Sequence, residues 1–309
     1  MKKKFFIVLI NIILTVFVYF SFKYISMIIL MSPQYNGLEV INAANYFMKL
    51  RSYEDFYKYH YRPEEYPDSK EKPIIILGCS FAQGLSSVKP LNDNETISYL
   101  LAQKFQTKRP VYNRALGSTG IQAMIWQFSS GEIYKIINKE PELIIYVLID
   151  DTMRRLYMEC NPWFKSAFYR EKKDGSLELI KNPIYYSYVA ALIRNFLEYP
   201  IYRERITDDQ KFDFLRKHFL LLKNEVNKKY KNTKFLILYY PRADYQNERI
   251  KTLENDGFDV IYVSDITPNN FLNEAKYRDS ETDPHPTKEA WEVITPRLYD
   301  EISRRYNIK

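Results

Sequence analysis

The chain has 309 residues, and its 45 Lys and Arg against 38 Asp and Glu give a formal net charge of +7. The only tight basic cluster is Lys2-Lys3-Lys4, so no run interleaves basic and aromatic side chains as a nucleic-acid groove would. Two cysteines are too few for a disulfide framework, no His/Cys cluster has zinc-site spacing, and no glycine-rich loop matches a nucleotide-binding fingerprint.

Residues 1–31 are predicted to anchor the chain in a membrane. Residues 5–22 carry no charge, and after Lys23 the apolar run resumes as far as Met31. A helix of about 20 apolar residues spans the hydrocarbon core of a bilayer. Because three lysines precede the run and few basic residues follow it closely, the amino terminus is expected in the cytoplasm and the rest outside. An uncleaved anchor is favoured over a cleaved signal peptide, because no small-x-small site follows the run.

Residues 32–70 read as a juxtamembrane connector, and residues 71–309 are predicted to form one α/β domain. The expected strands are 73–77, 110–114, 142–149, 234–240 and 258–263, and the expected helices are 94–106, 120–138, 208–230, 244–255 and 287–305. The strands are continuous apolar runs, typical of a parallel sheet covered on both faces. Their alternation with helices predicts a three-layer α/β/α sandwich with a central, mostly parallel sheet. Pro296 is expected to kink the last helix or to break it.

The alternation is interrupted at about residues 152–207. Residues 168–172 and 177–180 flank Asp174-Gly175 in the pattern of a β-hairpin, and residues 186–199 have the pattern of an apolar helix. The segment follows Asp151 at the end of a strand, so it would be either a lid or substrate-binding insertion, or a packing elaboration or membrane-facing patch. Arg154 and Arg155 could bind an anionic group, pair with Asp150 or Asp151, or be solvated, and pairing is favoured.

Residues 74–84 contain a candidate nucleophile. Four apolar residues run into Gly78, and Ser80 follows two positions later. Such a turn presents a hydroxyl at the carboxyl edge of a sheet, where open α/β sheets bind ligands. A serine needs a nearby base to become a nucleophile, and His285 in Asp283-Pro284-His285-Pro286 is the candidate. The alternatives are that Ser80 caps a helix or turn, and that Asp283 and His285 form a hydrogen-bonded turn.

These residues and their flanks resemble the SGNH (GDSL-like) hydrolase family. The segment Gly78-Cys79-Ser80-Phe81-Ala82-Gln83-Gly84 is similar to its first block, Gly-Asp-Ser-Phe-Thr-x-Gly. The segment Val111-Tyr112-Asn113-Arg114-Ala115-Leu116-Gly117-Ser118-Thr119-Gly120 is similar to the second block, and Asp283-Pro284-His285-Pro286 to the last. The resemblance covers roughly residues 71–309 and keeps the order of the blocks.

The resemblance implies a role for each matching residue. Ser80 would be the nucleophile, His285 the base and Asp283 the acid that orients it, with the backbone N–H groups of Ser80 and Gly117 as the oxyanion hole. In the third block the family has Gly-x-Asn-Asp, where this chain has Leu148-Ile149-Asp150-Asp151. The family asparagine donates an N–H to the oxyanion, whereas an aspartate can donate only in its protonated form. Asp150 would therefore be the third member of the hole only in its protonated form.

Together with the predicted topology, the resemblance implies a membrane-anchored, extracytoplasmic serine esterase that removes acyl groups from a cell-envelope carbohydrate. The acyl group expected from the resemblance is O-acetyl, and the chemistry requires no metal or organic cofactor. Two alternatives stay open, an acyltransferase of the same fold and a catalytically silent envelope binding or scaffold protein. Cys79 is expected to be a small buried residue, and a bridge between Cys79 and Cys160 is the less favoured alternative.

Overall fold

The computed structural model describes residues 69–85, 90–117, 120–157, 168–180, 207–241, 248–280 and 283–308, together with 13–19, 21–22 and 25. Within these ranges, no helix has both the length and the apolar character that crossing a bilayer requires. Most of the predicted anchor and connector, and the predicted helix at 186–199, lie outside the described residues.

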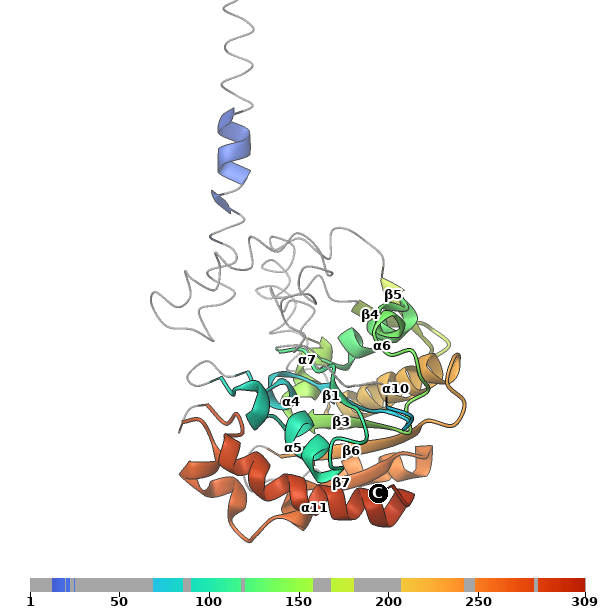
Figure 1. Ribbon diagram of the computed structural model, residues 1–309. Helices are drawn as coiled ribbons and strands as arrows, with labels where there is room; N and C mark the ends of the chain where they lie inside the picture. The colour runs from blue at the N-terminus through green and yellow to red at the C-terminus, as the bar shows by residue number, and fades with distance from the viewer. Residues whose placement is uncertain are drawn as a thin grey trace, which may run out of the picture.

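In the described part of the chain, one five-stranded parallel sheet forms the centre of the domain (Figure 1). The strands are β1 (Ile74–Gly78), β2 (Val111–Asn113), β3 (Leu143–Ile149), β6 (Lys234–Tyr240) and β7 (Asp259–Tyr262), in the order β2-β1-β3-β6-β7. Each pair of neighbours is parallel. The chain order reverses between β1 and β3, and the crevice at the carboxyl ends of such a pair is where doubly wound sheets bind ligands.

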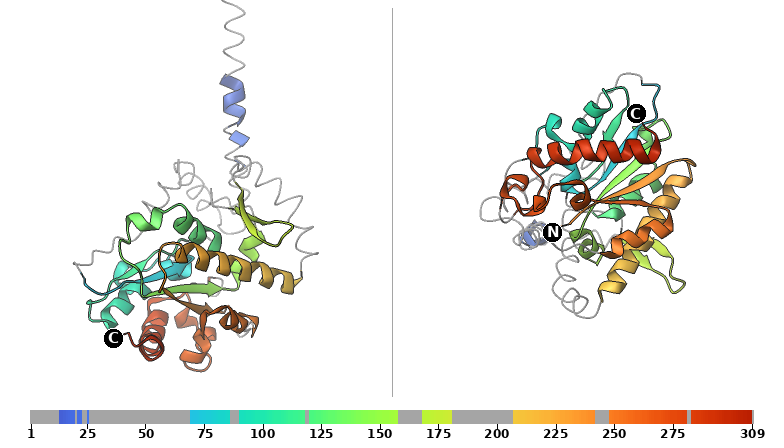
Figure 2. Two further views of the ribbon diagram at one scale, coloured as in Figure 1. Left: turned by 90° about the vertical axis from the view of Figure 1, so that its right-hand side faces the viewer. Right: turned by 90° about the horizontal axis from the view of Figure 1, so that it is seen from below.

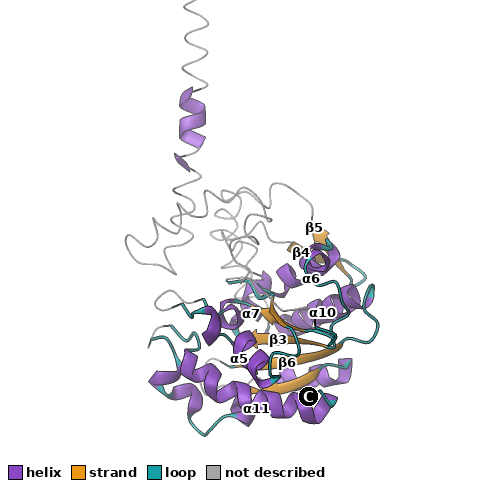
Figure 3. Cartoon of the chain, in the orientation of Figure 1, coloured by secondary structure: helices purple, strands orange, loops and turns teal. Residues whose placement is uncertain are grey.

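Helices cover both faces of the sheet, as predicted (Figures 2 and 3). One face packs on α6 (Ile121–Ser129) and α10 (Asp208–Asn227), and the other on α5 (Ile97–Lys104) and α11 (Lys288–Tyr306). Alternate side chains of each strand enter different cores, because successive side chains of a strand point to opposite faces. Ile75 of β1 lies in the core under α10, and Ile76 lies in the core under α11.

Two of the predicted helices differ in extent or type, and a third passes through a proline without the predicted break. The helix expected at 120–138 ends at Ser129, because Gly131 adopts a φ of 81° and a 3₁₀ turn, Glu132–Lys135, follows. The segment expected as a helix at 244–255 is a 3₁₀ helix over Glu248–Asp256. The prediction of a break at Pro296 is wrong, because α11 continues through this residue. The buried side chains on both sides of Pro296, Ile294 and Leu298, hold that helix against the sheet despite the missing N–H donor.

The hairpin predicted in the interruption is confirmed. Strands β4 (Phe168–Glu171) and β5 (Leu177–Ile180) pair antiparallel, and Gly175 takes a φ of 79° in the turn. The hairpin packs on α10: Tyr169 is buried, and the Lys217 ammonium lies 2.7 Å from a Glu171 carboxylate oxygen. The described hairpin of the interruption thus packs on a helix of the domain, and the choice between a lid and a packing elaboration stays a prediction.

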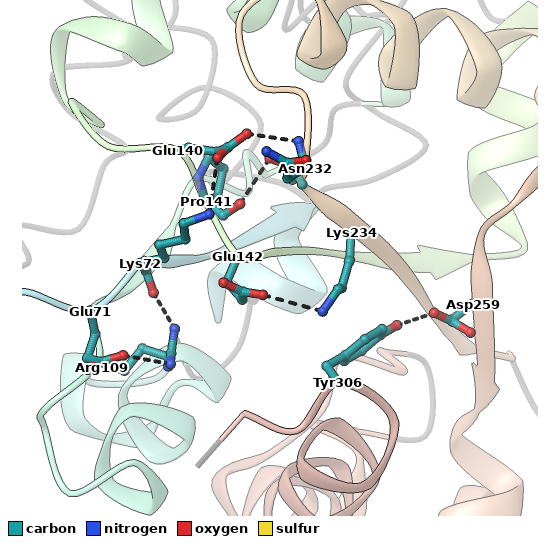
Figure 4. Close-up of polar contacts among 11 residues, drawn as sticks. Glu71, Lys72, Arg109, Glu140, Pro141, Glu142, Asn232, Lys234, Asp259 and Tyr306 are labelled. Atoms are coloured by element: carbon teal, nitrogen blue, oxygen red, sulfur yellow. Dashed lines mark hydrogen bonds and ion pairs between the residues drawn. The ribbon is translucent and has the colours of Figure 1, made fainter.

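Polar contacts join the strands at their amino ends (Figure 4). The Lys72 ammonium lies 3.1 Å from a Glu140 carboxylate oxygen, and the Lys234 ammonium lies 3.4 Å from Glu142. The Tyr306 hydroxyl at the end of α11 donates to Asp259 over 2.5 Å. These contacts belong to the edge opposite the predicted site, which lies at the carboxyl ends.

His218 of α10 is buried, and its burial should make the stability of the fold depend on pH. Its Nδ1 donates to the Phe214 carbonyl over 2.8 Å, and burial lowers the pKa of the imidazole to about 4. The unfolded chain takes up a proton near pH 6.5, and the folded protein does so only near pH 4. The stability due to neutral His218 is thus full above pH 6.5 and falls by about 3 kcal/mol as the pH drops to 4.

We therefore expect His218→Phe to flatten the pH dependence of the free energy of unfolding between pH 7 and pH 4. Urea titrations of both proteins at several pH values measure the difference, in which contributions from other titrating groups cancel. Parallel pH profiles for the two proteins would contradict the prediction.

Candidate active site

Ser80 stands at the carboxyl end of β1 because the chain turns sharply there. Gly78 has a φ of 142°, and a Cβ at this position would lie 2.9 Å from the Val147 carbonyl oxygen of β3. Only glycine fits so close to the neighbouring strand. The chain then enters the single turn α4 (Ser80–Gln83), which ends at Gly84 in the left-handed region. This turn leaves Ser80 8% exposed at the edge of the sheet.

The loop that precedes α11 brings Asp283 and His285 to the same edge. Backbone bonds close this loop on itself: Asp279 N–H donates to the His285 carbonyl over 2.9 Å, and Ser280 N–H donates to the Asp283 carbonyl over 3.0 Å. The Asp283 N–H in turn donates to the Ser280 hydroxyl over 2.9 Å. The two side chains are thus fixed by the backbone of a short, hydrogen-bonded segment.

Ser80, His285 and Asp283 form a continuous hydrogen-bonded chain. The Ser80 Oγ lies 2.6 Å from His285 Nε2, and His285 Nδ1 bonds to Asp283 Oδ1. The same Asp283 oxygen accepts the His285 backbone N–H over 3.1 Å. Because a carboxylate oxygen only accepts, Nδ1 carries the ring hydrogen and Nε2 is left to accept from the serine hydroxyl. This arrangement can remove the proton of a hydroxyl nucleophile.

An aromatic side chain packs on the imidazole. The ring centroids of Phe81 and His285 are 4.7 Å apart, and Phe81 itself contacts Tyr240 edge-on at 5.5 Å. Phe81 and Tyr240 are both buried. The packing limits the rotation of the imidazole and removes water from one of its sides. The preceding residue, Cys79, is buried, as expected, and Cys160, the partner in the less favoured disulfide, lies outside the described residues.

Gly117 is the second predicted oxyanion donor, and it lies beside Ser80. A Cβ on Gly117 would be 3.7 Å from the Ser80 Cβ. Its backbone N–H donates to the side-chain oxygen of Gln83 over 2.5 Å. Gln83 is 2% exposed and was not singled out from the sequence. The signal that could have found it is its spacing, three residues after Ser80 in one helical turn, which puts both side chains on one side.

Asp150 and Asp151 follow β3, the neighbour of β1 in the sheet. The Tyr239 hydroxyl of β6 donates to Asp150 Oδ1, so this oxygen serves as an acceptor. Asp151 pairs with Arg155 at 2.7 Å, and the predicted pairing is confirmed for these two residues. The side chain of Arg154 lies outside the described part of the structure. A donor role for Asp150 stays a prediction.

Among the residues that the structure describes, no three His, Cys, Asp or Glu side chains gather as a metal site would require. The site described above consists of a serine, an imidazole, a carboxylate and backbone N–H groups. These groups are sufficient for acyl transfer through a serine.

No family model and no curated protein matches the sequence. The solved structures that resemble the fold include a family two carbohydrate esterase from Clostridium thermocellum in complex with cellohexaose. It shares 12% identity, with 80% of this chain and 68% of that chain covered and a TM-score of 0.47. A psychrotrophic esterase from Pseudoalteromonas shares 13% identity, with 77% and 100% covered and a TM-score of 0.44. A protein described as a lipolytic protein of the G-D-S-L family, from Desulfitobacterium hafniense, shares 12%, with 74% and 99% covered and a TM-score of 0.41.

These similarities concern the backbone arrangement. A functional assignment has to come from the contacts of Ser80, His285 and Asp283.

Proposed function

We propose that this chain is a serine esterase whose nucleophile is Ser80. The observation that carries the proposal is the hydrogen bond of 2.6 Å between Ser80 Oγ and His285 Nε2, two side chains 205 positions apart in the sequence. A helix cap or a turn residue would not need an imidazole on its hydroxyl, nor a carboxylate on the far side of that imidazole. The proposal rests on the three residues together.

The proposed mechanism follows from the direction of the hydrogen bonds. Ser80 Oγ attacks the ester carbonyl carbon while His285 Nε2 takes the hydroxyl proton, and the carbonyl π electrons move to the oxygen. Asp283 stabilises the imidazolium through Nδ1–H. Collapse of the tetrahedral intermediate expels the alcohol, which takes the proton from Nε2. A water then attacks the acyl-serine with the same base and releases the acid. The Ser80 and Gly117 N–H groups are the proposed donors to the oxyanion.

The proposed substrate is an acylated carbohydrate of the cell envelope, with O-acetyl as the first acyl group to test. The resemblance of the sequence blocks to the SGNH hydrolases and the predicted topology support this choice. Measuring acetate release from acetylated xylan, acetylated peptidoglycan and p-nitrophenyl acetate separates a carbohydrate esterase from a general one. Adding a free sugar acceptor tests the acyltransferase alternative: acetyl-sugar formed at the expense of acetate would identify transfer.

The decisive experiment is covalent labelling by a fluorescent alkyl phosphonate. The wild-type protein is expected to label, and Ser80→Ala is expected to remain unlabelled under the same conditions. Equal labelling of both proteins, or no labelling of either, would overturn the proposed function.

Two contacts favour a second candidate, a catalytically silent binding protein. The Gly117 N–H already donates to Gln83, and Asp150 already accepts from Tyr239, so two groups of the predicted oxyanion hole have partners within the protein. A silent protein would bind the carbohydrate without labelling. The phosphonate experiment combined with a sugar-binding titration distinguishes the two candidates.

The membrane anchor is part of the proposal, and it is supported by the uncharged run at residues 5–22 and the lysines before it. Full-length protein is expected to stay with membranes after washing with high salt and with carbonate, and to keep its amino-terminal residues. A reporter fused after Lys309 should be active only outside the cytoplasm. Recovery of soluble protein that begins near residue 32 would contradict the anchor and indicate cleavage.

A further inference from the structure

Asp150 is a half-buried carboxylate at the edge of the sheet where the proposed nucleophile lies. It stands between β3 and the helix α7 (Asp151–Tyr157), and β3 pairs with β1 so that Val147 is opposite Gly78. Ser80 comes shortly after Gly78, as Asp150 comes shortly after Val147, so the two residues leave neighbouring strands at their carboxyl ends. The chain order reverses at this pair of strands, and a doubly wound sheet binds its ligand in the crevice there.

The loop after β2 also places Asp150 close to the nucleophile. A Cβ on Gly117 would lie 3.7 Å from the Ser80 Cβ, and a Cβ on Gly120 would lie 3.7 Å from the Cβ of Arg155 in α7. Three residue steps extend a chain by at most about 11 Å. The first turns of α7, which Asp150 immediately precedes, are therefore within reach of a substrate bound at Ser80.

A buried tyrosine fixes one oxygen of this carboxylate. The Tyr239 hydroxyl donates to Asp150 Oδ1, and Tyr239 of β6 is 0% exposed. The Tyr239 ring is held in turn by Tyr262, which it meets edge-on with the ring centroids 5.1 Å apart. Asp150 is thus held from the interior of the domain and remains partly exposed at the edge of the sheet.

We propose that Asp150 accepts a hydrogen bond from a hydroxyl that neighbours the ester in the substrate. This inference rests on the proposed esterase reaction, and it narrows the substrate class to monoesters of vicinal diols, such as partially acetylated sugars. An ionised carboxylate has about four acceptor positions, of which the Tyr239 hydroxyl uses one. It favours a neighbouring hydroxyl over a neighbouring ether or second ester, because those groups offer only acceptor oxygens.

The donor has to belong to the alcohol part of the substrate, since an acetyl group carries neither O–H nor N–H. The contact with Asp150 is therefore present until the alcohol leaves, and the acyl-serine that remains is the same for every acetate ester. For this reason the preference appears in kcat/KM, which reports the steps from free enzyme and ester to the acyl-serine.

The test compares 2-hydroxyethyl acetate with 2-methoxyethyl acetate on the full-length protein. The two esters have similar size and differ in the hydroxyl donor next to the ester. The wild type is expected to prefer the hydroxyl ester by about 10–10²-fold in kcat/KM, after division by the rate of alkaline hydrolysis of each ester. The preference is a ratio measured within one protein, so it does not depend on the folded fraction.

Asp150→Asn and Asp150→Ala are both expected to bring the preference to about one. In Asp150→Asn the Tyr239 hydroxyl holds the amide oxygen, and the outer position then carries an NH₂ group that cannot accept. Tyr239→Phe keeps the carboxylate and removes its anchor, so its preference is expected to lie between those of the wild type and Asp150→Asn. Asp265→Asn removes an exposed carboxylate elsewhere and should keep the wild-type preference.

A wild-type preference near one would overturn the inference, as would an Asp150→Asn variant with the wild-type preference. If Asp150→Asn raised kcat/KM for both esters by one common factor, position 150 would belong to the oxyanion hole and the inference would be wrong. A wild-type preference in Tyr239→Phe would overturn the positioning role of Tyr239. In each of these cases the hydrolysis of p-nitrophenyl acetate and its loss in Ser80→Ala still stand, so failure of the inference is distinct from failure of the proposed function.

Discussion

Ser80→Ala and His285→Ala are each expected to lower kcat by about 10⁴–10⁶-fold, and the double variant is expected to be little worse than either single one. The two side chains share one hydrogen bond of 2.6 Å. Once the first substitution has removed the nucleophile or its base, the remaining side chain no longer contributes to catalysis, so its removal costs little more. Steady-state kinetics on p-nitrophenyl acetate measure the three variants against the wild type.

The free energy of unfolding of these variants should change little, so a loss of catalytic activity can be distinguished from a loss of folded protein. Ser80→Ala removes one hydrogen bond, and the cost is about 1 kcal/mol in the free energy of unfolding. Ser129→Ala is the matched control, because Ser129 is an exposed serine on α6 whose hydroxyl donates to the Trp126 carbonyl of its own helix over 3.2 Å. Multiplicative losses in the double variant would show that Ser80 and His285 act independently, contrary to the proposed mechanism.

The strands of the sheet and their ends could be predicted from the sequence, because continuous apolar runs and the glycines that end them are local features of the chain. Residues 234–240 are a continuous apolar run and form β6 over the same range. Gly78 had to be a glycine because the neighbouring strand approaches its backbone, and the run of apolar residues before it fixes the strand. The position of Ser80 at the end of β1 therefore follows from a strand and its turn.

The meeting of Ser80 with His285 and Asp283 was predicted from the order of the sequence blocks. Composition and periodicity alone would not pair residues so far apart in the chain. Physically the pairing depends on the sheet order, since the loop before α11 has to return to the carboxyl end of β1. Block order carries that topological information, whereas local propensity does not.

Contacts between particular buried side chains could not be predicted from the sequence. Gln83 meets Gly117, and Tyr239 meets Asp150, only because separate strands place their ends side by side. The helix expected at 120–138 ends at Ser129, shortly before Gly131, and this glycine is a signal present in the sequence. The helix through Pro296 continued because burial of neighbouring side chains outweighs one lost hydrogen bond. Tertiary packing thus decided the contacts of Gln83 and Tyr239 and the continuation through Pro296, whereas the early helix end follows from a local glycine.

Asp283→Asn is expected to lower kcat by about 10²–10⁴-fold while KM stays close to the wild-type value. One oxygen of Asp283 accepts both the Nδ1–H and the backbone N–H of His285, over 3.1 Å for the latter. The backbone N–H holds an amide oxygen in the same place, so the imidazole keeps its orientation and loses mainly the negative charge that stabilises the imidazolium. Replacing the orienting aspartate of a serine–histidine–aspartate triad by asparagine costs about 10⁴ when the ring tautomer is also reversed.

The two contributions can be separated by the size of the loss. A fall near 10²-fold indicates that only the charge is lost, and a fall near 10⁴-fold indicates that the amide has turned its NH₂ toward Nδ1 and forced the proton onto Nε2. In both cases Ser80 remains present, so phosphonate labelling continues at a reduced rate, unlike in Ser80→Ala. Asp265→Asn, an exposed aspartate on the described part of the chain, is the matched control and should keep full activity. Unchanged kcat in Asp283→Asn would remove Asp283 from the mechanism, because a buried carboxylate that stabilised an imidazolium could not lose its charge without slowing the reaction.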